Sequence, residues 1–369
     1  LNQHAEKVYC YRDFWEETPV ELRESEEQEW IRQIFLRLVR VGKGEKDTRQ
    51  RQTKQVLLSL AFCLMFGSLF SQQDEQYTQF MFNKLRYNAA YAGSNGAPTV
   101  TAIHRSQWVG LEGAPGSQVV TFDMPLLNNR IGVGGNIVRN SVAVSQNITL
   151  DGSYAYRVPL GPGVMSLGLQ ASLRYFSTNF SELTATQPIA SDNAIPVGLQ
   201  SKFVPNFGLG FYYHTEDFYL GFSSPRLLAN NIDLADDNGV IGKEVQHYYM
   251  MSGVIIGEEN FKFLPQILVK YLPSAPFDAD INLSFILMDR ITVGGTYRLG
   301  GSKERGFGES VGALFSAQVN DNLLVGVSYD LTLSDLKGVQ DGSIELALRV
   351  AFGDREDTPD KEYVNPRHF

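Results

Sequence analysis

Residues 343–352 read Ser-Ile-Glu-Leu-Ala-Leu-Arg-Val-Ala-Phe and alternate strictly between two kinds of side chain. Every second position from Ile344 to Phe352 is apolar, while the positions between them include Glu345 and Arg349. Successive side chains of a strand point to opposite faces of its sheet. The stretch therefore predicts a strand with one apolar face and one face that carries charge.

The same alternation recurs over roughly 250 residues with almost no helical period. The clearest apolar faces are Leu150-Tyr154-Tyr156-Val158, Leu167-Leu169-Ala171-Leu173-Tyr175, Ile291-Val293-Tyr297-Leu299 and Val325-Val327-Tyr329-Leu331. Their opposite faces hold Asp151, Ser153 and Arg157, then Ser166, Gln170 and Arg174, then Thr292, Thr296 and Arg298, then Ser328, Asp330 and Thr332. A soluble sandwich also alternates, but an apolar outside around a charged interior is typical of a barrel in a membrane. We predict an all-β, transmembrane outer-membrane β-barrel of about 14 antiparallel strands over residues 99–353.

The connections between the candidate strands support this architecture. The expected strands are 99–109, 117–126, 131–142, 147–159, 164–180, 203–214, 218–226, 245–256, 261–271, 278–287, 291–299, 309–319, 323–333 and 343–352. Short turns such as 127–130 alternate with longer loops such as 181–202 and 227–244, and outer-membrane barrels place their short turns in the periplasm. An even strand count predicts that both ends of the barrel face the periplasm. Strand 245–256 alternates least clearly.

Composition excludes several classes of protein. The mean hydropathy of −0.17 excludes a bundle of membrane helices but not a barrel, whose strands show only every second residue to lipid. Residues 72–369 carry 21 Lys+Arg and 30 Asp+Glu with no basic run, which argues against a nucleic-acid partner. Cys10 and Cys63 both precede this region, so it has neither a disulfide framework nor a Cys-based zinc site.

The N-terminal region predicts export. Basic residues up to Lys54 precede the apolar run 56–70, and Ser71-Gln72 follows, so residues 53–71 are expected to be a signal peptide cleaved near Ser71-Gln72. A lipoprotein signal at Cys63 is disfavoured because the bulky Phe62 precedes the cysteine. Residues 1–52 are interpreted as a non-native upstream extension. The expected localisation is the outer membrane.

Two blocks of sequence carry a family resemblance. Residues 79–93 read QFMFNKLRYNAAYAG and residues 107–115 read QWVGLEGAP. With the ending NPRHF at 365–369, they closely resemble the PorP/SprF family, outer-membrane barrels of the type IX secretion system in Bacteroidota. The signature positions, which are also candidate partner-binding residues, are Phe80, Met81, Phe82, Asn83, Tyr87, Asn88, Tyr91, Gly93, Gln107, Trp108, Gly110, Gly113, Pro115, Pro366, Arg367 and Phe369. The family's usual Tyr is His368 here.

The resemblance implies a non-enzymatic protein that supports secretion or surface anchoring of large cargo, such as gliding adhesins. It implies partners among the periplasmic ring and peptidoglycan-linked components of the secretion machine, besides the cargo and outer-membrane lipid. It implies no cofactor and transfers no catalytic residue. The alternative function that the residues leave open is an outer-membrane solute or fatty-acid channel.

The remaining segments yield expectations about position. Residues 72–98 are too irregular for a strand and too aromatic to remain solvated, so we expect them in the lumen or at the periplasmic mouth, where they would fill the barrel or dock a partner. Trp108 near a strand end suits the aromatic belt of the membrane interface. Gly110, Gly113 and Pro115 predict a shaped loop. Residues 354–369 are expected to be a charged periplasmic tail.

Charged residues on the inward faces predict either a salt-bridged filling, which we favour, or a water-filled pore. The expected lumenal charges are Arg105, Asp151, Arg157, Arg174, Arg298, Asp330, Glu345 and Arg349. A hydrolase would need a serine and a histidine with an orienting group, and only His104 and Ser106 share a face, on the outward stripe. The acidic run 236–238 could bind calcium, although a solvated loop is the simpler interpretation.

Overall fold

The computed structural model describes residues 74–182, 198–232, 244–258, 260–273, 278–300 and 308–352. The expected extension, the signal peptide, the tail with Pro366, Arg367 and Phe369, and the acidic run 236–238 lie outside these ranges. No helix among the described residues is long and apolar enough to cross a membrane.

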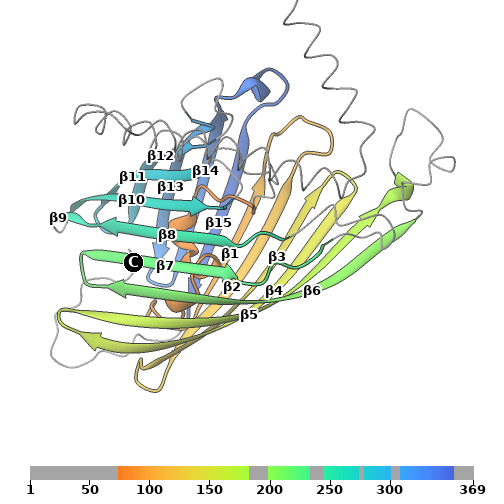
Figure 1. Ribbon diagram of the computed structural model, residues 1–369. Helices are drawn as coiled ribbons and strands as arrows, with labels where there is room; N and C mark the ends of the chain where they lie inside the picture. The colour runs from red at the N-terminus through yellow and green to blue at the C-terminus, as the bar shows by residue number, and fades with distance from the viewer. Residues whose placement is uncertain are drawn as a thin grey trace, which may run out of the picture. The chain divides into compact units, whose positions relative to one another are not determined.

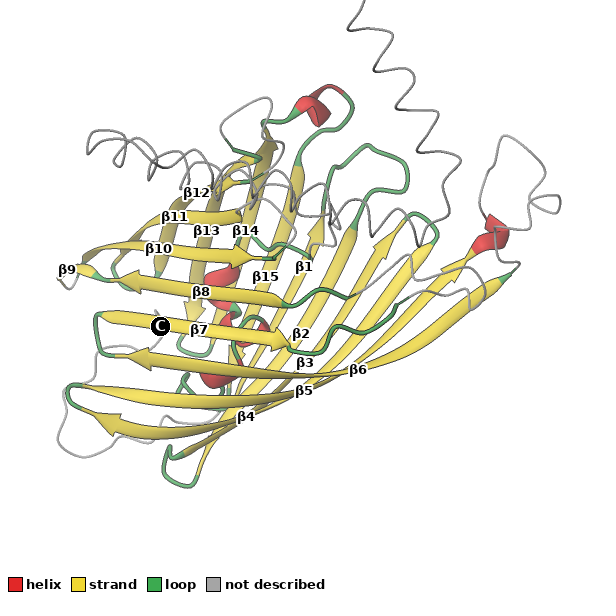
Figure 2. Ribbon diagram, viewed as in Figure 1, coloured by secondary structure: helices red, strands yellow, loops and turns green. Residues whose placement is uncertain are grey.

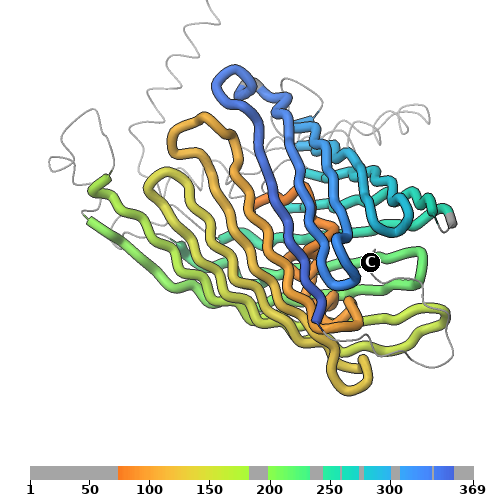
Figure 3. The backbone as a smooth tube through the Cα atoms, turned by 180° about the vertical axis from the view of Figure 1, so that it is seen from behind, coloured from red at the N-terminus to blue at the C-terminus, as the bar shows by residue number. Residues whose placement is uncertain are grey.

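The strands form one closed antiparallel sheet. They are β1 Thr99–Ser106, β2 Gly116–Leu126, β3 Ile131–Val142, β4 Ser145–Leu160, β5 Gly163–Asn179, β6 Leu199–His214, β7 Phe218–Arg226, β8 His247–Val254, β9 Ile256–Glu258, β10 Phe261–Tyr271, β11 Asp278–Leu287, β12 Ile291–Leu299, β13 Ser310–Asn320, β14 Leu323–Thr332 and β15 Ser343–Ala351. β9 continues β8 along β10, so the two make one strand of the wall. β15 pairs with β1 and β10 with β11, which closes the predicted 14-stranded barrel (Figures 1 and 3).

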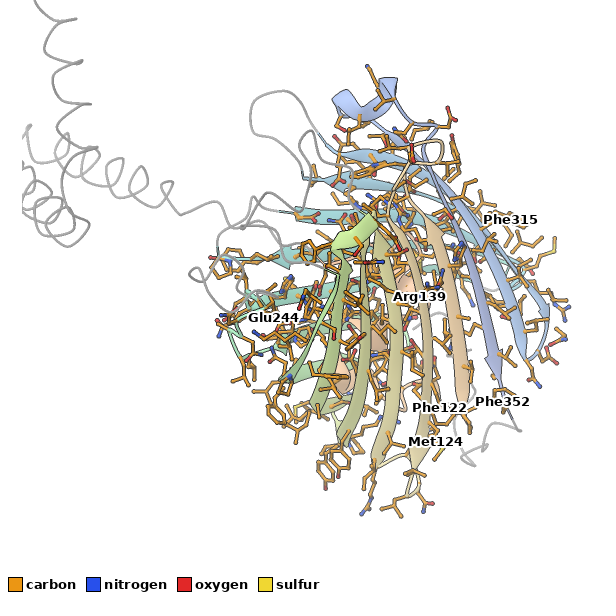
Figure 4. The ribbon with its side chains drawn as sticks, turned by 90° about the vertical axis from the view of Figure 1, so that its right-hand side faces the viewer. Phe122, Met124, Arg139, Glu244, Phe315 and Phe352 are labelled. Carbon is orange, nitrogen blue, oxygen red and sulfur yellow. The ribbon has the colours of Figure 1, made fainter. Side chains whose placement is uncertain are left out.

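The alternation of the sequence becomes the two faces of this wall. On β15, Leu346 is 52% exposed while its neighbour Glu345 is fully buried. In the side view, Phe315 and Phe352 stand at the periphery of the strands (Figure 4). The outward stripes of β4, β5, β12 and β14 predicted from sequence alternate with buried polar residues in the same way. The predicted barrel with an apolar outside is therefore confirmed.

The surroundings of strand β8 explain why its sequence alternates less clearly than that of the other strands. Its odd positions are buried and its even positions face outward or are partly exposed, as in the other strands. However, the buried positions include Tyr249 and Met251, which are apolar because they pack against residues in the lumen. Apolar residues therefore lie on both faces, and the alternation disappears from the sequence while it persists in the structure.

The connections follow the expected rhythm with one exception. The turn between β2 and β3 uses left-handed backbone at Leu127, Asn128 and Asn129, with φ of 50°, 54° and 63°. The turn between β11 and β12 does the same at Met288. At the opposite rim, which carries the long loops, β3 and β4 are joined by residues 143–144 alone.

Residues 74–98 run through the lumen as three single turns of 3-10 helix. These are η1 Phe80–Phe82, η2 Lys84–Arg86 and η3 Ala89–Tyr91, and they lie inside the barrel wall (Figures 1 and 2). The segment ends at the short-turn rim, where Phe352 N donates to Pro98 O at 2.8 Å. Its described start, Asp74, lies instead beside the long-loop ends of β5 and β7. The first and last strands of the barrel therefore begin and end at the same rim, and the segment that precedes β1 reaches this rim by crossing the lumen from the other one.

Candidate functional site

The lumenal segment, residues 74–98, packs an apolar side against the inner wall. Phe80 and Leu85 are at most 1% exposed. The rings of Tyr91 and Tyr212 meet edge to face with centroids 5.3 Å apart, and Tyr87 and Tyr249 do the same at 5.3 Å. Such pairs contribute about 0.5–1.5 kcal/mol beyond the area that they bury. The segment and the inner face of the barrel wall therefore share one hydrophobic core.

Glycines on the inner face let the backbone of the segment approach the strands. A Cβ at Gly132 would lie 1.9 Å from Ala92 O, and one at Gly168 would lie 2.2 Å from Ala90 N. Neither contact can be relieved by rotating a side chain, because both neighbours are backbone atoms. Asn88 fixes the same region by donating from Nδ2 to Phe211 O at 2.8 Å. These strand glycines therefore form a recess for residues 88–93.

A buried carboxylate anchors the first part of the segment. Glu345 accepts hydrogen bonds from the backbone N–H groups of Thr78 and Gln79 at 2.9 and 2.8 Å. Its Oε2 also lies 3.1 Å from Arg105 Nη1, which contacts Asp330 Oδ2 at 2.7 Å. Thr78 Oγ1 donates to the same Asp330 oxygen at 2.6 Å. The structure thus brings together three of the expected lumenal charges around one end of η1.

A second charge cluster holds the described start of the segment. Asp74 pairs with Arg226 at 2.5 Å and with Arg174 at 3.2 Å, and Arg174 pairs with Glu244 at 2.7 Å. Glu75 pairs with Arg86 at 2.5 Å. Burial alone would raise the pKa of the Asp74 carboxyl, but Arg226 and its other cationic neighbours outweigh burial and hold that pKa well below its usual value.

A third cluster fixes the turn that leads into β1. Asp123 accepts from Asn95 Nδ2 at 3.0 Å and from Gly93 N at 3.2 Å. Arg157 donates to Gly93 O at 2.8 Å, and Arg349 donates to Asn95 Oδ1. Asp123, Arg157 and Arg349 all face inward, and each of them contacts this turn of the lumenal segment.

Most of the lumenal charges expected from the sequence do not pair with one another in the described part of the chain. Arg298 pairs with Asp280 at 2.7 Å, while Asp151 accepts from Ser172 Oγ rather than from an arginine. Within the described part of the chain, Arg157, Arg174 and Arg349 contact the lumenal segment, Glu244 or both, and none of them pairs with Asp151, Asp330 or Glu345. The sequence analysis missed Asp74, Glu75, Lys84, Arg86, Asp123, Arg226, Glu244, Lys270 and Asp280. Asp123 and Asp280 occupy inward positions of their strands, so alternation alone could have found them.

Lys84 places its side-chain nitrogen among the aromatic rings of the segment's core. Its side chain is 1% exposed, and Nζ lies 3.9 Å from the centroid of the Tyr219 ring and 5.6 Å from that of Tyr91. Burial, assisted by the positive charge of Arg349, holds the pKa of Lys84 well below its usual value. In its protonated form the side chain would gain about 2 kcal/mol or more from the aromatic faces, because water is excluded there.

The signature positions of the segment are mostly structural in this arrangement. Asn83 Oδ1 accepts from Thr121 Oγ1 at 2.9 Å, and Met81 and Tyr87 are buried. Phe82 is partly buried against the same core. The sequence left open whether this block contacts the wall or a partner. In the structure its side chains pack against the inner wall of the barrel.

A cavity of about 710 Å³ lies between the segment and the long-loop rim. The start of the segment, the loop between β1 and β2, and the long-loop ends of β3, β4, β5, β7 and β8 line it. Gln107, Trp108 and Pro115 belong to this lining, which differs from the aromatic-belt interpretation of Trp108. Left-handed backbone at Gly110 and Gly113, with φ of 91° and 72°, shapes the loop that carries them.

The structure adds no support for a hydrolase site at His104 and Ser106 or for a metal site among the described residues. Ser106 Oγ and His104 Nε2 are 3.2 Å apart on the outer face, and no described carboxylate orients the ring. Among the described residues, no three His, Cys, Asp or Glu side chains are grouped to hold a metal ion.

The Asp74–Glu75 cluster predicts an acid-sensitive barrel. Because the pKa values of both carboxyls are lowered from 3.8 and 4.5, their stabilisation is complete above about pH 4.5 and is lost as the pH falls toward the folded-state values. We expect the urea midpoint of the detergent-solubilised protein to fall below pH 4, and Asp74→Asn to reduce that fall. An equal pH response in both proteins would contradict this role of Asp74.

Most of the chain matches a known family of membrane proteins. A family model described as "Type IX secretion system membrane protein PorP/SprF" matches residues 69–350. No relative was found among the curated proteins.

Solved outer-membrane barrels resemble the fold. The CymD monoaromatic hydrocarbon channel is 12% identical, with a TM-score of 0.46, over 76% of this chain and 94% of that one. The Acinetobacter baumannii outer membrane protein Omp33 is 9% identical, with a TM-score of 0.41, over 70% of this chain and 100% of that one. A Pseudomonas aeruginosa FadL homologue is 12% identical, with a TM-score of 0.38, over 78% of this chain and 96% of that one.

Proposed function

Because this chain belongs to the PorP/SprF family of type IX secretion system membrane proteins, we propose that it acts there as a closed scaffold barrel that supports secretion or surface anchoring of cargo. Large surface proteins such as gliding adhesins are the proposed cargo. The observation that carries the proposal is the lumenal segment, which is held to the wall by three polar clusters and an aromatic core. A barrel filled in this way suits an assembly role better than a transport role.

The two rims suit different partners. The apolar outer wall would contact outer-membrane lipid. The long-loop rim, with its cavity and the loop carrying Trp108, would meet cargo or the translocon outside the cell. The short-turn rim and the tail 354–369 would meet the periplasmic ring and peptidoglycan-linked components. This orientation rests on the rule that outer-membrane barrels keep their short turns in the periplasm.

The alternative function is an outer-membrane solute or fatty-acid channel, and the position of the lumenal segment inside the barrel argues against it. A solute would have to pass residues 74–98, whose aromatic and charged side chains are buried against the wall. Conductance of the unaltered protein that changes when Arg174 or Arg298 is replaced would favour the channel.

Deletion of the gene tests the proposal. We expect cells without it to lose one or more large proteins from their surface, because the scaffold that holds or exports them is gone. Mass spectrometry of medium and cell-surface fractions measures this loss. Release of one large protein into the medium indicates a dedicated anchor, and loss of many unrelated secreted proteins indicates a core component. An unchanged set of secreted and surface proteins would refute the proposal.

A further inference from the structure

Strands β4, β5 and β6 are longer than a membrane requires. They have 16, 17 and 16 residues, whereas β1, β7 and β8 have 8, 9 and 8. About 9–11 residues of a tilted strand cross the hydrocarbon core of a bilayer. The short-turn ends of the three strands lie at the same rim as those of the other hairpins. Their additional residues therefore project beyond the membrane at the long-loop rim (Figures 1 and 2).

The outward side chains of this projection remain apolar. Ile148 of β4 pairs in register with Tyr175 of β5, which pairs with Phe203 of β6. The ring centroids of Tyr175 and Phe203 are 4.8 Å apart. Phe203 is 63% exposed, and Leu199, at the long-loop end of β6, is 64% exposed. We call these four residues the upper patch.

A flat lipid surface does not account for the upper patch. The register row that contains Ile148 continues to Arg139 of β3. It then passes through Gln118 of β2 and His104 of β1, so that three polar side chains face outward on these strands. Arg139 lies closer to the short-turn rim than the upper patch does. A membrane surface at which Arg139 meets water therefore leaves the upper patch in water, and contiguous exposed apolar surface marks an interaction site.

The position of the upper patch identifies the kind of partner that it fits. The patch faces sideways, above the lipid-facing side chains of Leu150, Leu173 and Phe207 on the same three strands. A partner that covers it must therefore stand beside the barrel in the same membrane. Apolar walls gain little by meeting inside lipid, because lipid tails are equally apolar. The upper patch adds a hydrophobic contact that lipid does not replace, since water surrounds it.

We propose that the upper patch docks against a neighbouring integral protein of the outer membrane, which presents apolar side chains just above the lipid surface. The proposal rests on the proposed function as a scaffold, and it names the face through which the barrel contacts another membrane component. Lipid and a second copy of this chain are the other candidate occupants. Each occupant would leave a different pattern of accessibility at the patch.

A single cysteine measures whether the patch is covered. Both native cysteines precede residue 72, so Phe203→Cys places one thiol in the chain that follows the expected signal peptide. Its reaction with a membrane-impermeant maleimide is compared in two preparations of protein produced from the chromosomal gene. One is isolated outer membranes, and the other is nanodiscs that hold one purified barrel in lipid extracted from those membranes. We expect labelling about tenfold slower in the outer membranes, as when about nine molecules in ten are covered.

Control positions calibrate the labelling. Glu112→Cys, in the exposed loop between β1 and β2, is expected to react in both preparations, and Leu346→Cys, on the lipid-facing side of β15, in neither. A second reporter, Leu199→Cys, is expected to lose its protection when Phe203→Ser is added. The matched Val339→Ser, which removes an exposed apolar side chain from the loop between β14 and β15, should leave that protection intact.

Three results would overturn the proposal. Rapid labelling of Phe203→Cys in both preparations would show that nothing covers the patch, and slow labelling in both would show that lipid covers it. Slow labelling of the purified barrel in vesicles that hold many copies would assign the patch to a second copy. Gene deletion tests the proposed function separately, so an uncovered patch together with lost surface proteins would reject this contact alone.

Discussion

Glu345→Ala is expected to lower the free energy of unfolding of the barrel by about 3–5 kcal/mol, the usual cost of removing one partner from a buried charge pair. The carboxylate is fully buried, accepts two backbone N–H groups of the lumenal segment and pairs with Arg105. Its loss would leave Thr78 N and Gln79 N without these acceptors, and Arg105 with fewer partners. Glu345→Gln should cost less, because an amide oxygen can still accept one of the N–H groups.

Urea unfolding in detergent micelles, followed by tryptophan fluorescence, measures the free energy of unfolding. Resistance of residues 74–98 to protease measures how firmly the lumenal segment is held. Glu112→Ala serves as the control, because Glu112 is exposed in the loop between β1 and β2, where substitutions usually change stability by less than about 0.5 kcal/mol. A Glu345→Ala protein as stable as that control would show that the anchor contributes nothing.

Gly168→Val is expected to displace the lumenal segment and to open a conducting path through the barrel. The added Cβ would lie 2.2 Å from Ala90 N and 2.5 Å from Ala89 C, both in the backbone. The side chain cannot turn away from η3, so either the segment or the wall must move. The wall is held by pairing along the whole of β5 with β4 and β6, so the segment should give way. A barrel of fourteen strands is wide enough to enclose water once it is emptied.

Conductance in planar bilayers measures this effect. The unaltered protein is expected to be nearly silent and Gly168→Val to show steady channels. Gly152→Val is the matched control, because Gly152 lies on the outward face of neighbouring β4 with no atom within 4 Å of an added Cβ. Equal conductance of the two variants would mean that the segment does not close the lumen, and large conductance of the unaltered protein would favour the channel.

The sequence determined the wall of this protein. A strand has a period of two, so each residue's face can be read directly from its position. Glu345 and Leu346 could therefore be assigned to opposite sides of β15 from their adjacent positions in the chain alone. The specific blocks at 79–93 and 107–115 also identified the family, although they did not show what their side chains contact.

Which residues meet inside the barrel could be seen only once the strands had closed around the lumenal segment. Alternation assigns a side chain to the lumen but does not choose its neighbour across the lumen, which depends on closure and on whatever fills the space. The lumenal segment has no period of its own, so its contacts with Glu345, Asp123 and Arg226 left no signal in the sequence. The same segment makes the inner face of β8 apolar and so obscured that strand. Local periodicity fixed the faces, and long-range packing fixed the partners.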